Sequence, residues 1–278
     1  MFHLYRETTY LLIVTTILGL LLLIMTDGTA VAATTASVSS LDPSFIHTSG
    51  SATSPHMPYQ FLTLNDSADL TFNQLLGINK HGVIAGYFGS GMIVNGMLRA
   101  NKGYTLSPLY DQGNYTSENF PGSVQTQVTD LNNADYTAGF WVDSIGNNFG
   151  FVQWQGGFTS YKDPHTGTSN GVQVNQLLGL NDKGIAVGFY TDSKGNDHAY
   201  TLDQNKGKFS EIPTASIPGA VSAMATGINN DGDVVGSYTD ASGTMHGFLL
   251  KESRVSVFDY PGIAHVTGTT FLGINSND

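Results

Sequence analysis

The stretch Gly-Ile-Asn-Asn-Asp-Gly-Asp-Val-Val-Gly-Ser-Tyr (Gly227–Tyr238) decides the fold, because versions of it recur along the chain. In each version an Asn is followed seven residues later by a Gly inside a hydrophobic run. The pairs are Asn79/Gly86, Asn132/Gly139, Asn181/Gly188 and Asn229/Gly236, and Asn275 begins a fifth copy. Self-similarity at a fixed period predicts an array of similar structural units.

The spacing of an anchor position, two residues before each Asn, gives the size of one unit. The separations between anchors are 53, 49, 48 and 46 residues, at Gly77, Asp130, Gly179, Gly227 and Gly273. A period of about 40–50 residues is typical of a four-stranded propeller blade. No segment after residue 32 has the 3.6-residue periodicity of a helical repeat. We therefore predict an all-β, β-propeller-like fold with four four-stranded repeats.

The fourth unit shows how one repeat is built. Short hydrophobic runs separated by Gly-containing turns predict four strands, at Ala223–Asn229, Val234–Tyr238, His246–Leu250 and Arg254–Asp259. Gly232 and Gly243 stand where tight turns need a left-handed backbone. The third unit repeats the pattern at 185–190 and 198–202, and all the connections are short enough for antiparallel neighbours.

The repeated Gly of the second strand is always followed, two residues later, by an aromatic residue. Alternate residues share one face of a strand, so the Gly and the aromatic ring lie on the same face. The absence of a side chain beside a ring predicts close approach of a neighbouring sheet. The aromatic residues are Phe88, Trp141, Tyr190 and Tyr238.

The residues Gly227–Tyr238, followed by His246-Gly247-Phe248, resemble the HAF-type extracellular repeat, which is named after a His-Ala-Phe triplet. The triplets of this chain are degenerate, at Asn95-Gly96-Met97, Phe149-Gly150-Phe151, His198-Ala199-Tyr200 and His246-Gly247-Phe248. The resemblance covers residues 58–278. It implies a secreted, propeller-like bacterial protein, and it implies no settled activity.

The two ends of the repeat region predict a partial fifth blade shared by the two termini. Tyr59–Leu64 matches the fourth strand of a unit, and Thr270–Asn275 matches a first strand. Closure of a ring removes exposed strand edges. Either the ring closes around this reduced blade, or the sequence is a truncated fragment, and we favour truncation because the fifth motif stops at its Asn.

Residues 1–32 have the plan of a secretory signal peptide. Arg6 precedes an apolar run, Leu11–Met25, and Ala30-Val31-Ala32 offers a small-x-small cleavage site. An uncleaved N-terminal membrane anchor is the alternative. Residues 33–57, rich in Ser, Thr and Ala, predict a flexible linker, and residues 58–278 form the repeat domain. The predicted location is secreted, extracellular or periplasmic, with membrane contact only through an uncleaved N-terminal segment.

The composition excludes several classes of protein. Charged residues make up 12% of the chain, against about 25% in typical domains. The formal net charge of −11 argues against a nucleic-acid partner, which needs basic patches. Without Cys there are no disulfides and no thiolate metal sites.

The candidate chemical residues favour structural roles. His198 and His246 are equivalent in the third and fourth units, and their variation in other units predicts packing rather than catalysis. His81, His165 and His265 have no zinc-ligand spacing. Asp192–Asp197 lacks the ligand pattern of a calcium loop, and Gly167–Gly171 matches Gly-x-Ser-x-Gly without the strand-turn-helix context.

We predict no catalytic, cofactor-binding or metal-binding residues, no cofactor, and a ligand-binding site that the sequence does not locate. Our main hypothesis is a non-catalytic binding or interaction scaffold for an extracellular glycan, peptide or envelope protein. The alternative is a polysaccharide- or peptide-active hydrolase or lyase with its site at the central channel, marked by acidic or His residues that are not repeated between units. A third hypothesis is a structural fragment that aggregates through exposed strand edges.

Overall fold

The structure, a computed structural model, describes residues 10–16, 19–26, 29–31, 62–260 and 268–276. The chain divides into two compact parts, an N-terminal part (residues 1–63) and a repeat part (residues 64–278). The predicted linker, residues 33–57, lies outside the described residues.

The N-terminal part contains one antiparallel sheet of three strands, β1 (Tyr10–Thr16), β2 (Gly19–Thr26) and β3 (Thr29–Val31). The apolar run of the predicted signal peptide falls in β1 and β2. Within the described residues, we find no helix that is both long and apolar enough to span a membrane. Export therefore stays a prediction.

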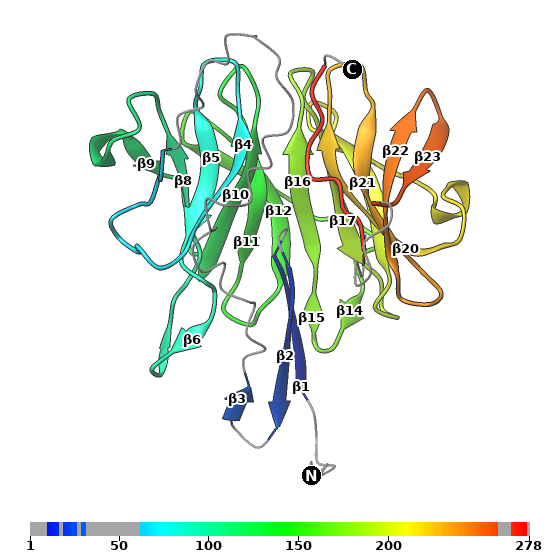
Figure 1. The fold of residues 1–278 in the computed structure, drawn as a ribbon, viewed down its shortest axis with the longest axis horizontal. Coiled ribbons are helices and arrows are strands. Elements are labelled where there is room, and N and C mark those ends of the chain that lie inside the picture. Colours follow the sequence, from blue (N-terminus) through cyan, green and yellow to red (C-terminus); the bar gives the residue numbers. More distant parts are fainter. Residues whose placement is uncertain (1–9, 17–18, 27–28, 32–61, 261–267, 277–278) are drawn as a thin grey trace, which may run out of the picture. The chain divides into compact units, whose positions relative to one another are not determined.

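The repeat part contains four four-stranded antiparallel sheets, which follow one another along the chain (Figure 1). The first sheet comprises β4 (Asn73–Ile78), β5 (Ile84–Phe88), β8 (Lys102–Leu106) and β9 (Tyr115–Ser117). The second comprises β10 (Gln125–Leu131), β11 (Thr137–Val142), β12 (Asn148–Trp154) and β13 (Gly157–Tyr161). The third comprises β16 (Asn175–Leu180), β17 (Ile185–Thr191), β18 (Asp197–Asp203) and β19 (Lys208–Glu211). The fourth comprises β20 (Ala220–Ile228), β21 (Val234–Asp240), β22 (Met245–Lys251) and β23 (Arg254–Phe258).

Two short hairpins and two 3-10 helices of the described residues stand outside these sheets. They are the hairpins β6 (Ile93–Val94) with β7 (Met97–Leu98) and β14 (Thr168–Ser169) with β15 (Val172–Gln173), and the 3-10 helices η2 (Gln112–Asn114) and η3 (Thr214–Ser216). The predicted all-β class is confirmed. The Gly-x-Ser-x-Gly motif lies at the β14–β15 hairpin, as its polar context predicted, and not on a strand-turn-helix elbow.

The predicted strands of the third and fourth sheets lie within one to three residues of the observed ones. The turns between them use the expected backbone, with φ of 90° at Gly232 and 84° at Gly243. In the second sheet the same turn position holds Asp135, whose φ is 60°. Asp tolerates this left-handed conformation better than most residues, so the turn survives the loss of its Gly.

The sheets pack face to face, and their first strands lie side by side. β10 contacts β4 on one side and β16 on the other, and β16 contacts β20. Buried apolar side chains fill the spaces between successive sheets. One such cluster joins Val187 and Ala199 of the third sheet to Ala225 and Phe248 of the fourth. Similar clusters lie between the first and second sheets and between the second and third.

The repeated Gly of the second strand has a different cause from the predicted one. A β-bulge interrupts the pairing of the first and second strands in every sheet, for example between Leu177 and Gly179. A Cβ on Gly188 would lie 1.9 Å from the carbonyl oxygen of Gln176 in the same sheet. Gly86, Gly139 and Gly236 meet the corresponding carbonyl at 2.1, 2.0 and 2.0 Å. The close approach is therefore within one sheet, at the bulge, and the prediction of an approaching neighbour sheet was wrong.

The third strand of the first unit was also misplaced. Asn95 and Gly96, with φ of 51° and 77°, form the turn of the inserted β6–β7 hairpin. The residue that pairs with Phe88, as His198 pairs with Tyr190, is Lys102. The first triplet is therefore Lys102-Gly103-Tyr104, and all four triplets read as a variable residue, a small residue and an aromatic ring.

The two strands predicted for a fifth blade are not regular strands among the described residues. Of Tyr59–Leu64, residues 59–61 lie outside the described residues, and Leu62–Leu64 is not a strand. Leu64 instead packs against Ile84 and Tyr104 of the first sheet. The C-terminal segment lies along β20, where the Thr226 hydroxyl donates to the Phe271 carbonyl at 2.6 Å. It takes the position of a next first strand without forming a regular one.

Candidate functional site

The repeated Asn of each unit holds its own turn and the neighbouring unit together. In the third sheet, Asn181 Oδ1 accepts the backbone N–H groups of Lys183 and Ile185, both at 3.0 Å. Its Nδ2 donates to the backbone carbonyl of Asn229 in the next unit at 2.9 Å. The buried side chain of Asn181 thus has its acceptor and a donor satisfied.

The same link runs in one direction through all the units. Asn79 donates to the Asn132 carbonyl at 3.2 Å, and Asn132 donates to the Asn181 carbonyl at 3.2 Å. Asn229 donates to the Asn275 carbonyl at 3.3 Å. We call this chain of four links, from Asn79 to Asn275, the Asn ladder. It is a structural role for the repeat motif that the sequence did not reveal.

A second set of links joins the residues that follow each Asn. The backbone N–H of Lys80 donates to Asn133 Oδ1 at 2.8 Å, and that of Asn133 donates to Asp182 Oδ1 at 2.7 Å. The N–H of Asp182 donates to Asn230 Oδ1 at 2.9 Å. Burial alone would raise the pKa of Asp182, but hydrogen bonds from Asn133 and Asn230 lower it overall. Asp182 therefore serves as a charged acceptor between two units.

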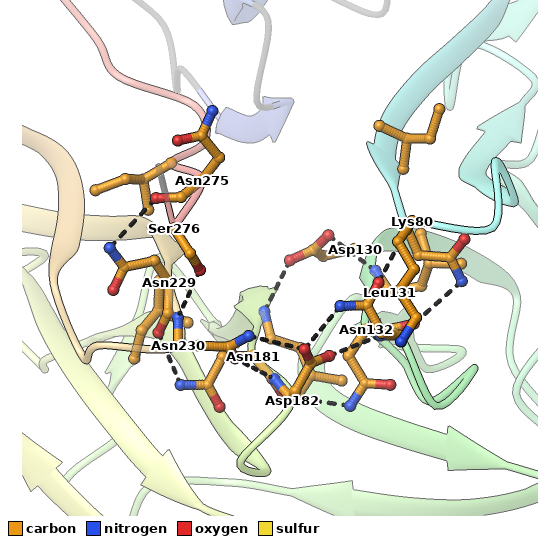
Figure 2. Close-up of a pocket in the computed structure, with 16 residues that line it drawn as sticks. Lys80, Asp130, Leu131, Asn132, Asn181, Asp182, Asn229, Asn230, Asn275 and Ser276 are labelled. Carbon is orange, nitrogen blue, oxygen red and sulfur yellow. Dashed lines mark hydrogen bonds between the residues drawn. The ribbon is translucent and has the colours of Figure 1, made fainter. Parts of the chain in front are cut away.

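The two sets of links surround a central cavity formed by the first strands and the C-terminal segment. Figure 2 shows Asn181 and Asp182 between Asn132 on one side and Asn229 on the other. The polar end of the cavity has a volume of about 390 Å³, and an adjoining part of about 380 Å³ is lined mainly by glycines and aliphatic residues. The aliphatic residues are Leu76, Ile78, Leu178, Ile228, Leu272 and Ile274.

Asp130 is the acidic residue of the inner part of this cavity, and it breaks the repeat. Its position is held by Gly77, Gly179, Gly227 and Gly273 in the other units. The carboxylate reaches across to the third sheet, where Oδ2 accepts the N–H of Leu180 at 2.8 Å, and Oδ1 accepts the N–H of Leu131 at 2.8 Å. Burial raises the pKa of Asp130 to about 7, against the lowering effect of these two hydrogen bonds.

A carboxyl group with a pKa near neutrality can accept or donate a proton at physiological pH. Glycoside hydrolysis, however, generally uses two carboxylates that flank the bond to be broken. The other acidic residue around the cavity, Asp182, is engaged by Asn133 and Asn230. The sequence predicted no role for Asp130 beyond that of an anchor of the repeat, although its departure from Gly was the visible signal.

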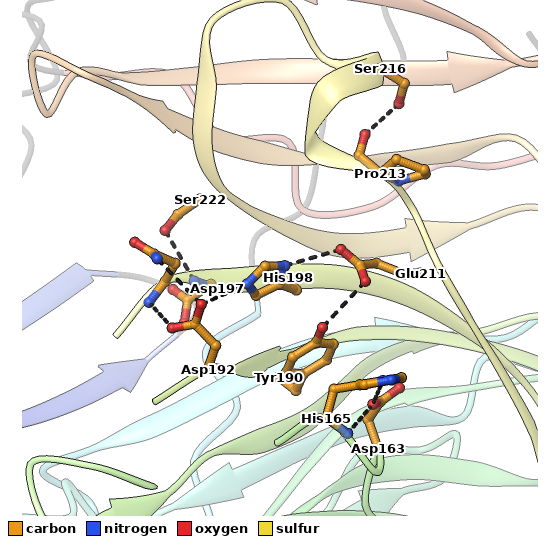
Figure 3. Close-up of polar contacts among 11 residues, drawn as sticks. Asp163, His165, Tyr190, Asp192, Asp197, His198, Glu211, Pro213, Ser216 and Ser222 are labelled. Carbon is orange, nitrogen blue, oxygen red and sulfur yellow. Dashed lines mark hydrogen bonds and ion pairs between the residues drawn. The ribbon is translucent and has the colours of Figure 1, made fainter. Parts of the chain in front are cut away.

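His198 lies between two carboxylates on the face of a tyrosine ring (Figure 3). Its Nε2 is 3.2 Å from Asp192 Oδ2, and its Nδ1 is 3.0 Å from Glu211 Oε1. The ring stacks on Tyr190 with centroids 4.9 Å apart. Burial alone would lower the pKa of His198, but the hydrogen bonds that its ring makes to both carboxylates raise it overall.

His246 repeats this arrangement in the fourth sheet. It contacts Asp259 at 2.7 Å and Asp240 at 3.4 Å, and it stacks on Tyr238 at 4.9 Å. Each ring thus links the turn after the second strand of its sheet to the end of the fourth strand. The packing role of His198 and His246 stays a prediction. Among the described residues, no cluster of three or more His, Asp or Glu side chains could hold a metal ion.

The remaining sequence candidates form local turn contacts. His165 Nδ1 lies 2.9 Å from Asp163 Oδ1, while its side chain is largely exposed. The Asp192 carboxylate, whose region was weighed as a calcium loop, accepts the N–H groups of Lys194 and Asn196 at 2.8 and 2.9 Å. Backbone hydrogen bonds thus explain this turn without a metal. His265 lies outside the described residues.

A groove beside the second sheet was not found from the sequence. Tyr136 and Trp154 stack there, with ring centroids 5.3 Å apart and an angle of 11° between the planes. The groove has a volume of about 310 Å³, and Gln204, in the turn between β18 and β19, forms part of its wall. We call it the aromatic groove, lined by Tyr136, Val152, Trp154, Gly157, Phe158, Thr159, Tyr161 and Gln204.

Comparisons with known proteins leave the family open. No family model matches the chain, and no curated protein matches it. Among solved structures, the chain is similar to an ulvan lyase of the polysaccharide lyase family PL25, with 11% sequence identity and a TM-score of 0.36. The match covers 69% of this chain and 58% of the lyase, so this chain spans less than two thirds of that protein.

Proposed function

We propose that this chain is a secreted, non-catalytic binding scaffold built as a β-propeller-like ring. In this proposal the four sheets are blades, and the C-terminal segment contributes to a partial fifth. The observation that carries the proposal is the engagement of the polar groups around the central cavity in links between units. Asn181 and Asp182, for example, each bond to both neighbouring units or to their own turn.

If a ligand took one of these polar groups, the present partner of that group would lose its hydrogen bond. A buried donor or acceptor without a partner costs free energy, so such binding is disfavoured. The cavity therefore suits a structural hub better than a binding site. Connections at the surface are free to vary around such a hub, as loops on rigid scaffolds do. Export is supported by the plan of residues 1–32, a basic start, an apolar run and a small-x-small cleavage site.

The test is a binding screen coupled to a turnover assay. The full chain, exported with its own N-terminal segment, is screened against neutral and acidic polysaccharides, proline-rich peptides and cell-envelope fractions. The proposal expects retention by at least one of these without change in polymer length, reducing ends or ultraviolet absorbance. Release of new reducing ends or of unsaturated sugars would overturn the non-catalytic part, and failure to bind any probe would overturn the scaffold.

A second candidate function is a hydrolase or lyase with its site in the central cavity. Asp130 favours it, because this carboxyl group faces the cavity, is absent from the other units and has a pKa of about 7. If the screen detects turnover, Asp130→Asn should abolish it without loss of polymer binding. Turnover that survives this substitution would exclude a role for Asp130 as the acid or base.

A further inference from the structure

The aromatic groove differs from the repeat scaffold because its two rings occur in the second unit alone. The positions of Tyr136 and Trp154 correspond to Asp233 and Lys251 in the fourth unit, from the shared strand registers. There the Lys251 Nζ and Asp233 Oδ2 atoms form an ion pair at 3.4 Å. The second unit thus replaces a charged contact with a stacked, partly exposed aromatic pair, which the shared fold does not require.

The polar groups that border the rings are free to bind a ligand. Within the described part of the chain, the Trp154 indole N–H, the Thr159 hydroxyl and the Gln204 side-chain amide take part in no hydrogen bond. The Tyr136 hydroxyl is likewise without a partner there. Trp154 is 46% exposed. A flat apolar face is therefore bordered by uncommitted donors and acceptors from two neighbouring sheets.

The charge of the groove narrows the class of ligand. None of its lining residues is charged, whereas the whole chain carries a formal net charge of −11. An acidic protein repels anionic ligands at long range, and the groove offers no cation to compensate. A neutral molecule with an apolar face and several hydroxyl groups fits these properties.

The walls of the groove are held by the core on both sides. Val152 is 5% exposed, and Tyr136 and Tyr161 pack against the buried cluster that joins the second and third sheets. The Tyr161 hydroxyl donates to the Gln204 carbonyl at 3.5 Å. Rigid walls reduce the ordering cost of binding, and the volume of about 310 Å³ lies at the lower end of the range of ligand pockets.

We propose that the aromatic groove binds a neutral pyranose ring of a glycan, with the sugar face stacked on Trp154 and its hydroxyl groups bonded to Thr159 and Gln204. This inference rests on the proposed binding function and names its site and ligand class. A stacked aromatic platform supplies contact area at low conformational cost. The free side-chain donors and acceptors then fix the orientation of the ring.

The experiment uses Trp fluorescence, because the chain has just two Trp residues. Trp141 stacks on Phe120 with centroids 4.4 Å apart, outside the lining of the groove, and Trp141→Phe keeps an aromatic ring there. The full-length Trp141→Phe protein then reports on Trp154 alone. It is titrated with linear hexasaccharides of β-linked glucose, xylose or mannose, and separately with a decaproline peptide.

The proposal expects that at least one hexasaccharide shifts or quenches Trp154 emission in a saturable way. Trp154→Ala, tested by calorimetry in the otherwise unchanged chain, should weaken binding by about tenfold or more. Gln204→Ala should weaken it by a smaller factor. Leu109→Ser is the matched control, because Leu109 is an 86% exposed apolar residue outside the groove, and its binding should equal that of the unaltered chain.

Three results would overturn the proposal. They are no response to any of the hexasaccharides, sugar binding that Trp154→Ala leaves intact, and saturable binding of decaproline in place of sugar, which would assign the groove to a peptide. The outcomes also separate this inference from the proposed function. Sugar binding that does not depend on Trp154 would contradict the aromatic groove as the binding site and would leave the proposed binding scaffold standing. Cleavage of a sugar bound at Trp154 would support the groove as the binding site and would contradict a non-catalytic function.

Discussion

At the residue scale, the side chain of the repeated Asn has two structural roles. Its carbonyl oxygen accepts two backbone N–H groups of its own turn, and its amide nitrogen donates to the next unit. Neither Asp nor Ser could do both, because Asp has no donor and Ser has a single short hydroxyl group. The seven-residue Asn…Gly spacing therefore preserves a joint between units as well as a turn.

Replacing Asn181 by Ala tests this joint. The change removes three hydrogen bonds around a buried side chain and leaves the N–H groups of Lys183 and Ile185 without their acceptor. We expect the free energy of unfolding to fall by roughly 2–4 kcal/mol, measured by urea denaturation with circular dichroism. Asn205→Ala is the control, since Asn205 is exposed and its side chain has no hydrogen bond in the described region. Equal stability of the two variants would show that the Asn ladder is not stabilising.

Asp130 gives the molecule a dependence of stability on pH. Its pKa is about 7 in the folded state and 3.8 as an ordinary carboxyl group. Between these values the folded chain retains a proton that the unfolded chain has released. The contribution of Asp130 to the free energy of unfolding therefore falls as the pH rises from about 4 to about 7. One pKa unit corresponds to about 1.4 kcal/mol, so the effect is measurable.

The variant Asp130→Asn keeps an acceptor oxygen and removes the titration. We expect it to lose this fall in stability, so that it gains on the unaltered chain between pH 4.5 and pH 7.5 in urea denaturation. Asp231→Asn removes one exposed carboxylate in the fourth unit and serves as the control for the change in net charge. A constant difference between Asp130→Asn and the unaltered chain at both pH values would mean that Asp130 titrates alike in the folded and unfolded states.

The sequence identified the important Asn residues but not all that they do. Their effect on the turn followed from local backbone chemistry, which a single stretch of sequence contains. The donation of Asn181 to Asn229 joins residues 48 positions apart, and it depends on how closely two sheets approach. Asp130 was missed for the same reason, because a carboxylate at a Gly position is only informative once that position is known to face a cavity.

At the element scale, the bulge between the first and second strands explains the repeated Gly better than contacts between sheets do. The register shifts between Leu177 and Gly179, and the Gln176 carbonyl oxygen beside this shift lies 1.9 Å from where a Cβ on Gly188 would stand. A side chain on Gly188 would have to displace backbone, since the nearest atoms are the Gln176 carbonyl oxygen and carbon. The period of the Gly therefore records the period of the bulge.

We expect Gly188→Ala to destabilise the chain by about 3 kcal/mol or more, because a new methyl group there forces a backbone shift in a packed sheet. Thermal or urea denaturation measures the change. The matched control is Gly157→Ala, where the nearest atom to a new Cβ is the Trp154 carbonyl oxygen at an ordinary 3.4 Å. If Gly188→Ala and Gly157→Ala have the same midpoint of denaturation, the steric explanation of the repeated Gly is wrong.

The elements themselves were largely predictable, with one instructive failure. Alternating apolar residues and Gly turns placed β17, β18 and β21–β23 within a few residues, because both signals act locally. The β6–β7 hairpin was instead read as part of the third strand. Asn95-Gly96 is a strong signal for a two-residue hairpin turn, and expectation of a repeated triplet at that spacing hid it. The aromatic groove escaped because its residues come from two sheets.

At the scale of the whole molecule, the Asn ladder has a direction, and its last link needs an acceptor. Each unit donates to the one that follows, and the fourth unit donates from Asn229 to Asn275. The C-terminal segment also receives the Thr226 hydroxyl bond, and Phe271 packs on Phe258 with centroids 5.4 Å apart. The segment thus stands in for the first strand of a further unit, although it forms no regular strand.

Deleting residues 268–278 should therefore weaken the fourth sheet in particular. The deletion removes one of the two acceptors of Thr226 and one of the two of Asn229, the Phe271 and Asn275 carbonyl groups. It also uncovers Gly227, which otherwise lies against the Gly273 backbone. We expect a loss of about 3 kcal/mol from the hydrogen bonds and the apolar contact. Hydrogen exchange should show the loss first in β20–β23, since the hydrogen bonds of Thr226 and Asn229 and the Phe258–Phe271 contact involve that sheet. Deletion of residues 277–278 alone is the control and should leave the exchange pattern unchanged. Uniform loss of protection over all four sheets would instead mean that the units unfold as one block, so that the C-terminal segment stabilises the ring as a whole.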